Sequence, residues 1–201
     1  MYIFGASGHG KVIAEIAEEN NIPIKGFIDS DQSKNKVLDY KVVHEIPIKH
    51  IDVVVSIGNN AIRKMIVNNN LQFNYLSLIH PKSTKSKRAK IDEGTVVMAG
   101  VSINSEVVIG KHCIINTNSS IDHECIVADY VHISPNAALA GNVEVGEGTH
   151  IGIGASIIQG VKIGKWCTVG AGAVIIKNIP DYAVVVGNPG KIIKYNSVIE
   201  N

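Results

Sequence analysis

The sequence predicts a mixed α/β plus all-β protein: a small Rossmann-like βαβ domain over residues 1–80, followed by a β-helix over residues 81–201 that ends in a C-terminal cap. The first observation behind this prediction is an unbroken six-residue period of aliphatic side chains. Helices repeat at about 3.6 residues and strands at about 2, so neither produces it. A hexapeptide period is typical of a parallel β-helix. The second observation is an apolar run, a glycine-rich turn and an amphipathic segment at the N-terminus, which indicate half of a doubly wound sheet.

The N-terminal elements follow from local patterning. Apolar runs bounded by glycine or aspartate predict parallel strands, and apolar residues spaced three or four apart predict helices. The expected elements, in chain order, are a strand at 2–4, a glycine-rich turn at 5–10, a helix at 11–19, a strand at 26–28, a buried strand at 52–57 and a helix at 61–69.

The glycine-rich turn has the spacing Gly5-x-x-Gly8-x-Gly10 between a strand and a helix. Glycines let the backbone approach a phosphate, and a helix N-terminus offers unpaired N–H groups. Asp29 ends the next strand, where a ribose-binding acid lies in dinucleotide folds. Because the domain is too short for a complete dinucleotide fold, the pattern favours a mononucleotide or nucleotide sugar over NAD, with a turn that binds no ligand as the alternative. His9 either contacts that ligand or is an exposed residue at the helix start.

The aliphatic column sets the phase of the β-helix. Three hexapeptides make one coil, so equivalent positions recur every 18 residues, and the residue two places before each aliphatic one is small or β-branched. Cys113, Cys125 and Cys167 occupy this small inward position, so we expect them in the core and not as nucleophiles. Glycines that follow the aliphatic residue, such as Gly110 and Gly146, are expected at turns that need an unrestricted backbone. The column consists of Ile91, Val97, Ile103, Ile109, Ile115, Ile121, Val127, Ile133, Leu139, Val145, Ile151, Ile157, Ile163, Val169 and Ile175.

The segments that flank the column are less regular. The run KSTKSKRAK, at residues 82–90, is expected to be a solvated connector before the first coil, as short charge runs usually are. Residues 179–191 break the six-residue rhythm, and we expect them to cap the open end of the solenoid.

Composition argues against several classes of function. The net charge is +1, and no basic stripe suggests nucleic-acid binding. No apolar stretch reaches the ~20 residues of a membrane helix, and the N-terminus does not resemble a secretion signal. The cysteines show no pairing pattern, which suits a reducing compartment. The chain is therefore expected to act in the cytoplasm, without a membrane or nucleic-acid partner.

The histidines within the repeats fall into three cases. His112 is expected on the surface. In the sequence DHE, two carboxylates flank His123 at a coil corner, which suits a general base if a turn brings the side chains together. His132 and His150 are 18 residues apart and are expected to stack on successive coils. Such a pair could instead belong to a metal site, as in carbonic anhydrases of this shape.

Four segments together resemble a known family: IFGASGHGKV, IDVVVSIGNNAIRK, the stretch from NTNSSIDHEC to GTHIGIGA, and VVGNPGK. They resemble the sialic-acid O-acetyltransferase-like sugar acyltransferases, nearest to the nucleotide-amino-sugar N-acetyltransferases of the bacillosamine type, over almost the whole chain. The resemblance implies a left-handed β-helix, a homotrimer with active sites between neighbouring prisms, and acetyl-CoA as co-substrate with no metal. The implied reaction acetylates the amino group of a nucleotide-linked 4-amino sugar in surface-glycan (lipopolysaccharide) biosynthesis.

The resemblance also implies roles for single residues. His123 matches the general base, and Glu124 matches the acid that tunes it. The positions matched to acetyl-CoA are His132 near the thioester, with Ile153 and Ala171 along the pantetheine arm. The positions matched to the nucleotide sugar are Ser7, Gly8 and His9 at the diphosphate, Asp29 and Ser30 on the uracil or ribose side, and Gly58.

Three other functions stay open. An O-acetyltransferase for a sialic acid or capsule sugar would use the same base. A metal-dependent β-helix hydratase would use the stacked histidines. A non-enzymatic scaffold would not bind acetyl-CoA and would leave the DHE sequence at the coil corner unexplained.

Overall fold

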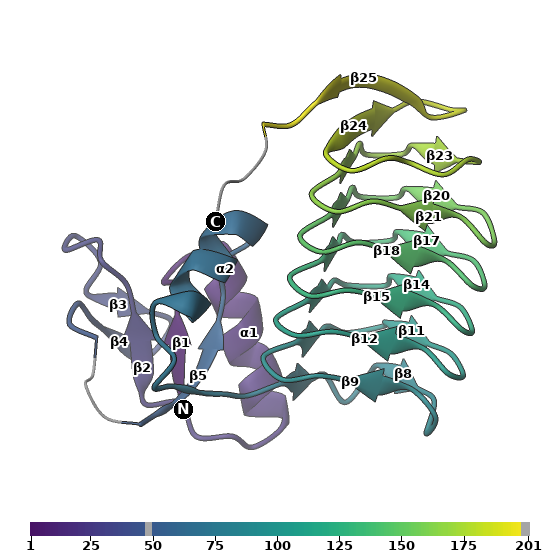
Figure 1. Cartoon of the computed structure of the whole chain (residues 1–201). Coiled ribbons are helices and arrows are strands. Elements are labelled where there is room, and N and C mark those ends of the chain that lie inside the picture. The colour runs from purple at the N-terminus through teal and green to yellow at the C-terminus, as the bar shows by residue number, and fades with distance from the viewer. Residues whose placement is uncertain (47–49, 198–201) are drawn as a thin grey trace.

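The computed structural model describes residues 1–46 and 50–197, so residues 47–49 and 198–201 of the two predicted domains lie outside the described residues. An N-terminal α/β part lies beside a regular solenoid (Figure 1). The predicted succession of a βαβ domain and a parallel β-helix is confirmed. Within the described ranges, the helices are too short or too polar to cross a membrane.

The N-terminal part is built on a six-stranded sheet with the order β3-β4-β2-β1-β5-β6. Neighbouring strands are parallel except β3 and β4, which form a hairpin. The elements are β1 (Tyr2–Phe4), α1 (Gly8–Glu19), β2 (Gly26–Ile28), β3 (Lys36–Val37), β4 (Tyr40–Val43), β5 (Asp52–Val55), α2 (Asn60–Asn68) and β6 (Asn74–Tyr75). The predicted strands and helices are present, with α1 beginning inside the predicted glycine turn.

The two helices attach the sheet to the solenoid. The apolar face of α1 includes Ile13, and it shares one buried cluster with Val96 and Ile114 of the solenoid. The cluster on α2 contains Val67, and it joins the sheet to Tyr130 of the solenoid. Both helices therefore bury apolar surface against coils, at about 25 cal/mol per Å² of apolar surface removed from water.

The solenoid has three sheets that are parallel except for β25, and most of their strands are two residues long. Neighbouring strands within the coils lie 18 residues apart in sequence. The docking face, which packs on the N-terminal part, contains β7 (Leu78–Ile79), β10 (Val96–Val97), β13 (Ile114–Ile115), β16 (His132–Ile133), β19 (His150–Ile151), β22 (Thr168–Val169), β24 (Ala183–Val186) and β25 (Lys191–Tyr195). The second face contains β8 (Thr84–Lys85), β11 (Ser102–Ile103), β14 (Ser120–Ile121), β17 (Ala138–Leu139), β20 (Ser156–Ile157) and β23 (Val174–Ile175). The third face contains β9 (Lys90–Ile91), β12 (Val108–Ile109), β15 (Ile126–Val127), β18 (Glu144–Val145) and β21 (Lys162–Ile163).

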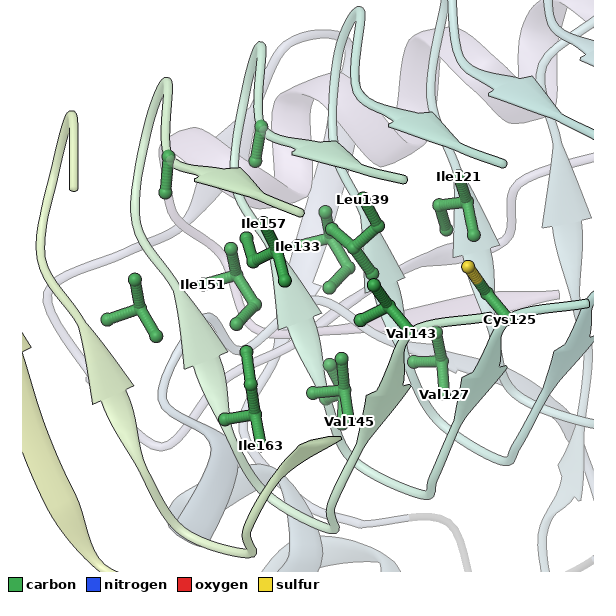
Figure 2. Close-up of a cluster of buried hydrophobic side chains, with 14 of the residues drawn as sticks. Ile121, Cys125, Val127, Ile133, Leu139, Val143, Val145, Ile151, Ile157 and Ile163 are labelled. Atoms are coloured by element: carbon green, nitrogen blue, oxygen red, sulfur yellow. The ribbon is translucent and has the colours of Figure 1, made fainter. Parts of the chain in front are cut away.

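The aliphatic column fills the interior of the solenoid (Figure 2). Ile133 is in register with Ile151 of the next coil, and both are 0% exposed. Each such side chain contributes about 1.5–3 kcal/mol when it is fully buried. The three cysteines are buried within the same core, as predicted.

Residues 82–90 belong to the first coil, which begins with β7, so the expectation that they form a connector was wrong. In this coil β8 pairs with β11, and β9 pairs with β12. The aliphatic position of β8 is held by Lys85, which is exposed although it is in register with Ile103. The period was hidden because one inward side chain is missing, whereas strand pairing uses only the backbone.

Left-handed backbone conformations recur three residues after the aliphatic ones from Ile91 to Val169, as at Glu124 with a φ of 61°. Gly110 and Gly146 do not lie at these positions. A Cβ atom at Gly110 would overlap Asp129, and one at Gly146 would lie 2.5 Å from the backbone nitrogen of Lys165. These glycines are therefore needed because the next coil approaches closely, and the expectation of an unrestricted turn was wrong.

The predicted C-terminal cap is a hairpin at the end of the docking face. β24 continues that face in parallel with β22, and β25 then returns antiparallel to β24 (Figure 1).

Candidate active site

His123 lies at the corner between the second and third faces, in the turn that joins β14 to β15. Its backbone N–H donates to Asp122 Oδ1 at 2.8 Å. Glu124 has the left-handed φ of 61° that recurs at these corners, and the turn brings its side chain beside the imidazole. The ring Nδ1 lies 2.9 Å from Glu124 Oε2. The turn thus brings the two side chains together, as the sequence led us to expect.

This contact settles which ring nitrogen of His123 can act as a base. An ionised carboxylate only accepts hydrogen bonds, so Nδ1 carries the proton and donates to Glu124. Nε2 then keeps its lone pair. The side chains of His123 and Glu124 are 56% and 60% exposed, so this basic nitrogen is accessible to a substrate.

Gly141 lies directly beneath the imidazole, one coil along from His123. A Cβ atom at Gly141 would lie 2.5 Å from the ring Cε1 and 2.7 Å from Nε2. Both residues line a pocket of about 320 Å³. Sequence reasoning missed Gly141, although its separation of 18 residues from His123 is the signal that could have identified it.

A larger hollow of about 540 Å³ lies along the third face and is lined in part by Glu144 and Lys162. These two side chains neutralise each other in an ion pair of 2.7 Å. The larger hollow is therefore not the better candidate for an active site. The pair of His123 and Glu124, with its accessible ring nitrogen, lies at the smaller pocket.

His132 and His150 stack on the docking face, as predicted, with ring centroids 4.7 Å apart and planes 4° apart. Asn116 Oδ1 accepts from the Thr117 N–H at 2.8 Å, so its amide group donates to His132 Nε2 at 3.1 Å. Burial lowers the pKa of His132 to about 3, with His150 and Arg63 adding to the effect. His132 is therefore neutral and carries its proton on Nδ1.

The glycine-rich loop connects β1 to α1. Ser7 and Gly8 are exposed at the start of α1, and no atom lies within 4 Å of where a Gly8 Cβ would be. A Cβ at Gly10 would overlap the carbonyl oxygen of Gly5, so the helix packs tightly on the loop. Burial, with a smaller effect of Arg63, lowers the pKa of His9 to about 4. The loop therefore offers open backbone beside a neutral histidine.

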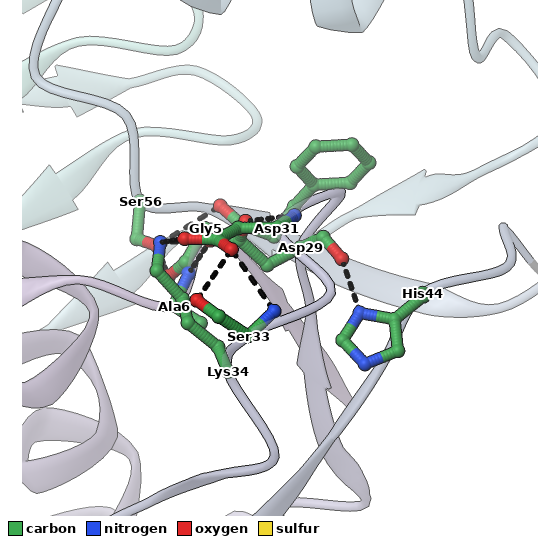
Figure 3. A network of polar contacts seen from close by, with 9 residues as sticks. Gly5, Ala6, Asp29, Asp31, Ser33, Lys34, His44 and Ser56 are labelled. Atoms are coloured by element: carbon green, nitrogen blue, oxygen red, sulfur yellow. Dashed lines mark hydrogen bonds and ion pairs between the residues drawn. The ribbon is translucent and has the colours of Figure 1, made fainter.

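Asp29 fastens this loop to the end of β2 (Figure 3). Its Oδ2 accepts from the Ala6 N–H at 2.8 Å and from Lys34 Nζ at 3.0 Å, and its Oδ1 accepts from the Asp31 N–H at 3.0 Å. Burial would raise the pKa of Asp29, but these hydrogen bonds outweigh burial and lower it. Both oxygens are thus already engaged, whereas Ser30 beside it is exposed.

The residues singled out from the sequence form three groups in one chain. The first lies at the carboxyl ends of β1, β2 and β5, where Ser7, Gly8, His9, Asp29, Ser30 and Gly58 gather beside the docking face that carries His132. Ile153 and Ala171 lie exposed on successive coils at the corner between the docking and second faces, where the Gly172 N–H donates to the Ile153 carbonyl at 2.8 Å. His123 and Glu124 lie at the corner opposite the docking face.

Both parts of the chain match known proteins. Residues 1–70 match the family model "PglD N-terminal domain", and residues 142–177 match "Bacterial transferase hexapeptide (six repeats)". The curated UDP-N-acetylbacillosamine N-acetyltransferase of Bacillus subtilis is 40% identical over 108 residues. That match covers 48% of this chain and 50% of the relative, so the chain spans about half the length of the curated relative.

Two solved structures are similar over almost their full length. PerB from Caulobacter crescentus, in complex with CoA and GDP-perosamine, is 34% identical with a TM-score of 0.90, covering 96% of each chain. The acetyltransferase domain of PglB from Neisseria gonorrhoeae, in complex with acetyl coenzyme A, is 39% identical with a TM-score of 0.90, covering 96% of this chain and 98% of that one. The chain belongs to the hexapeptide-repeat sugar N-acetyltransferase family. The resemblance found in the sequence is confirmed, and the solenoid is the left-handed β-helix of this family.

One feature of this family member contradicts a prediction: His112 is only 3% exposed. Its ring stacks on Tyr130, with centroids 5.3 Å apart, and meets Tyr75 edge-on at 4.8 Å. Burial, partly offset by Glu93, lowers the pKa of His112 to about 4. The expectation of a surface histidine was wrong because the N-terminal part covers this corner of the solenoid.

The surroundings of the three cysteines and of the two stacked histidines bear on whether these groups could act as nucleophiles or as metal ligands. Burial raises the pKa of Cys113 to about 12 and also raises the pKa of Cys125 and Cys167, so these thiols are poor nucleophiles. Among the described residues, no group of three His, Cys, Asp or Glu side chains could hold a metal ion. His132 and His150 meet through their ring faces, while their Nε2 atoms contact Asn116 and Ser134.

Proposed function

We propose that this protein is an acetyl-CoA-dependent N-acetyltransferase that acetylates the amino group of a nucleotide-linked 4-amino sugar. His123 is the general base of the reaction, and the product enters surface-glycan biosynthesis. The observation that carries the proposal is the 2.9 Å contact from His123 Nδ1 to Glu124 Oε2, which leaves Nε2 as a base at the rim of a pocket. The family to which the chain belongs supports the class of reaction.

The reaction needs two proton transfers, both through His123, and no covalent enzyme intermediate. The neutral sugar amine attacks the carbonyl carbon of acetyl-CoA, and His123 Nε2 removes a proton from the attacking nitrogen. The carbon–sulfur bond then breaks, and the sulfur leaves as the thiol with the proton that His123 returns. Backbone N–H groups of the coil corner are suited to hold the oxyanion of the tetrahedral intermediate. General-base catalysis contributes about 10²–10⁴ in rate.

The acceptor is assigned to the glycine loop and the neighbouring strand ends. Ser7, Gly8 and His9 would hold the diphosphate, and Ser30 and Gly58 would contact the nucleoside, with Asp29 fixing the loop. The relative PerB was solved with GDP-perosamine, a nucleotide-linked sugar. Acetyl-CoA would extend from His132 along the exposed backbone at Ile153 and Ala171.

A homotrimer would complete this site. His123 lies at the corner opposite the docking face, whereas the acceptor loop lies on the far side of the docking face in the same chain. This separation within one chain supports a site in which the base and the acceptor loop come from neighbouring copies. Closed three-fold symmetry repeats such a shared site three times.

The test is thiol release from acetyl-CoA against a panel of 4-amino sugars linked to UDP, dTDP, GDP or CMP, with free sialic acid as a hydroxyl acceptor. We expect release with at least one amino sugar, together with a product that has gained one acetyl group. Release with sialic acid alone would identify an O-acetyltransferase. A protein that binds no acetyl-CoA would instead be a scaffold.

A further inference from the structure

Arg63 in α2 is a buried cation that has no role predicted from the sequence, although it lies within the segment IDVVVSIGNNAIRK. It is 1% exposed, and within the described ranges it forms no ion pair. Its guanidinium donates instead to neutral oxygens from both parts of the chain. The acceptors are the carbonyls of His112 at 2.8 Å, Tyr130 at 2.8 Å, Ile57 at 2.8 Å and Gly58 at 3.4 Å, and the Asn60 side-chain Oδ1 at 2.8 Å.

Two of these acceptors, the carbonyls of His112 and Tyr130, are separated by one coil of the solenoid. His112 and Tyr130 occupy the same corner of successive coils, 18 residues apart. Asn60, which accepts from Arg63, donates in turn to the Gly148 carbonyl of a third coil at 2.9 Å. A planar fork of donors matches carbonyls that repeat at the strand spacing of about 4.8 Å, whereas a lysine ammonium is a point charge.

The other acceptors belong to the loop between β5 and α2. Its Gly58 is exposed, and no atom lies within 4 Å of where its Cβ would be, so a ligand can approach the backbone there. At the start of this loop, Ser56 Oγ donates to the Gly5 carbonyl at 2.6 Å. Arg63 therefore binds the Gly58 loop directly. Through Ser56, the same loop contacts the glycine-rich loop, which is also assigned to the nucleotide sugar.

Stability alone is a weak reason for such a residue. Burying a guanidinium carries a large desolvation cost, which its hydrogen bonds must offset before they add to stability. Because Arg63 binds carbonyls of both the Gly58 loop and the coil that continues from Tyr130 to His132, it fixes the position of the loop relative to that coil.

We propose that Arg63 is a positioning residue for nucleotide-sugar binding, which locks the Gly58 loop in register with the coils beside His132. This inference rests on the proposed function, because the Gly58 loop matters to catalysis only if it contacts the acceptor. Loss of the fork displaces the loop and so weakens the contact between the Gly58 backbone and the nucleotide sugar, which lowers the affinity for that substrate.

The variants R63K and R63Q are compared with E147Q, which removes a different contact between α2 and the solenoid, the 2.7 Å ion pair with Lys64. We expect R63K and R63Q to raise the KM for the nucleotide sugar by roughly 10-fold or more, with kcat and the Kd of acetyl-CoA little changed. E147Q should leave the KM for the nucleotide sugar, kcat and the Kd of acetyl-CoA unchanged. Hydrogen exchange should rise in the backbone of residues 56–59 in R63K but not in E147Q.

A lower Tm with an unchanged KM and unchanged exchange at residues 56–59 would overturn the proposal, because Arg63 would then act on stability alone. If R63Q does not fold, R63K decides. If the wild-type protein acetylates no sugar in the panel, the proposed function fails, while the Kd of UDP, GDP and dTDP and the exchange at residues 56–59 still decide the role of Arg63.

Discussion

The bond between His123 Nδ1 and Glu124 Oε2 gives the two ring nitrogens different roles. Nδ1 is a fixed donor, and Nε2 is the atom that can accept a proton. This division depends on the left-handed φ at Glu124, because adjacent side chains on an extended strand would point apart.

Replacing His123 by alanine is expected to lower kcat by roughly 10²–10³-fold, within the range of about 10²–10⁴ that a general base contributes. The Kd of acetyl-CoA should stay unchanged, because Ile153 and Ala171 lie on another corner. Steady-state kinetics and titration calorimetry measure the two quantities. Turnover near that of the wild-type protein would remove His123 from the mechanism.

Replacing Gly141 by alanine is expected to lower kcat by roughly 10-fold or more, because the new Cβ would lie 2.5 Å from the His123 ring and push it aside. Gly141 has no left-handed φ, so alanine fits the backbone and Tm should change little. Alanine at Gly187 is a control, because this glycine has a φ of 94° and its Cβ would meet only the Pro189 carbonyl at 3.6 Å. It perturbs the backbone of the C-terminal hairpin, outside the pocket of His123. Unchanged kcat in G141A would show that the ring position does not matter.

At the scale of elements, the sequence predicted most of the coils, but it did not predict which residues of the N-terminal part pack against them. The six-residue period placed the cysteines inward and stacked His132 on His150, because a repeat fixes which side chains face the core. The first coil was not predicted, because Lys85 interrupts the six-residue period of aliphatic side chains. The environment of His112 depends on which element covers its corner, and no local pattern encodes that long-range contact. The partners of Arg63 were hidden for the same reason.

The docking of α1 and α2 on the solenoid is expected to weaken in acid. Burial lowers the pKa of His9 and His112 to about 4 and that of His132 to about 3. In the unfolded chain these groups titrate near 6.5. Below that pH the unfolded state binds more protons, so stability is fully present above about pH 6.5. It is lost towards pH 4 at up to about 1.4 kcal/mol per pH unit for each histidine.

Urea unfolding at several pH values between about 7 and 5 measures this loss. H132N should reduce the pH dependence by about one proton, because asparagine does not titrate in this range. A free energy of unfolding that stays constant over this interval would contradict the assignment of neutral buried histidines.

For the whole molecule, the separation of His123 from the acceptor loop predicts complementation between inactive variants. H123A lacks the base, and G8E places a negative charge where the diphosphate binds, in open space beside the loop. Refolding the two together in equal amounts should restore about a quarter of the wild-type activity, because a quarter of shared sites combine an intact base with an intact loop. Each variant refolded alone is the control, and activity no greater than their sum would show that each site lies within one chain.

The pairing of strands 18 residues apart also limits how the length of this protein can change. Removing or adding one whole turn of the chain keeps every side chain on its own face. A change of six residues preserves the inward column but rotates all later residues by one face, which would move a base from a corner opposite the N-terminal part to another corner. Natural or engineered length variants that remain active should therefore differ within the solenoid by multiples of a full turn.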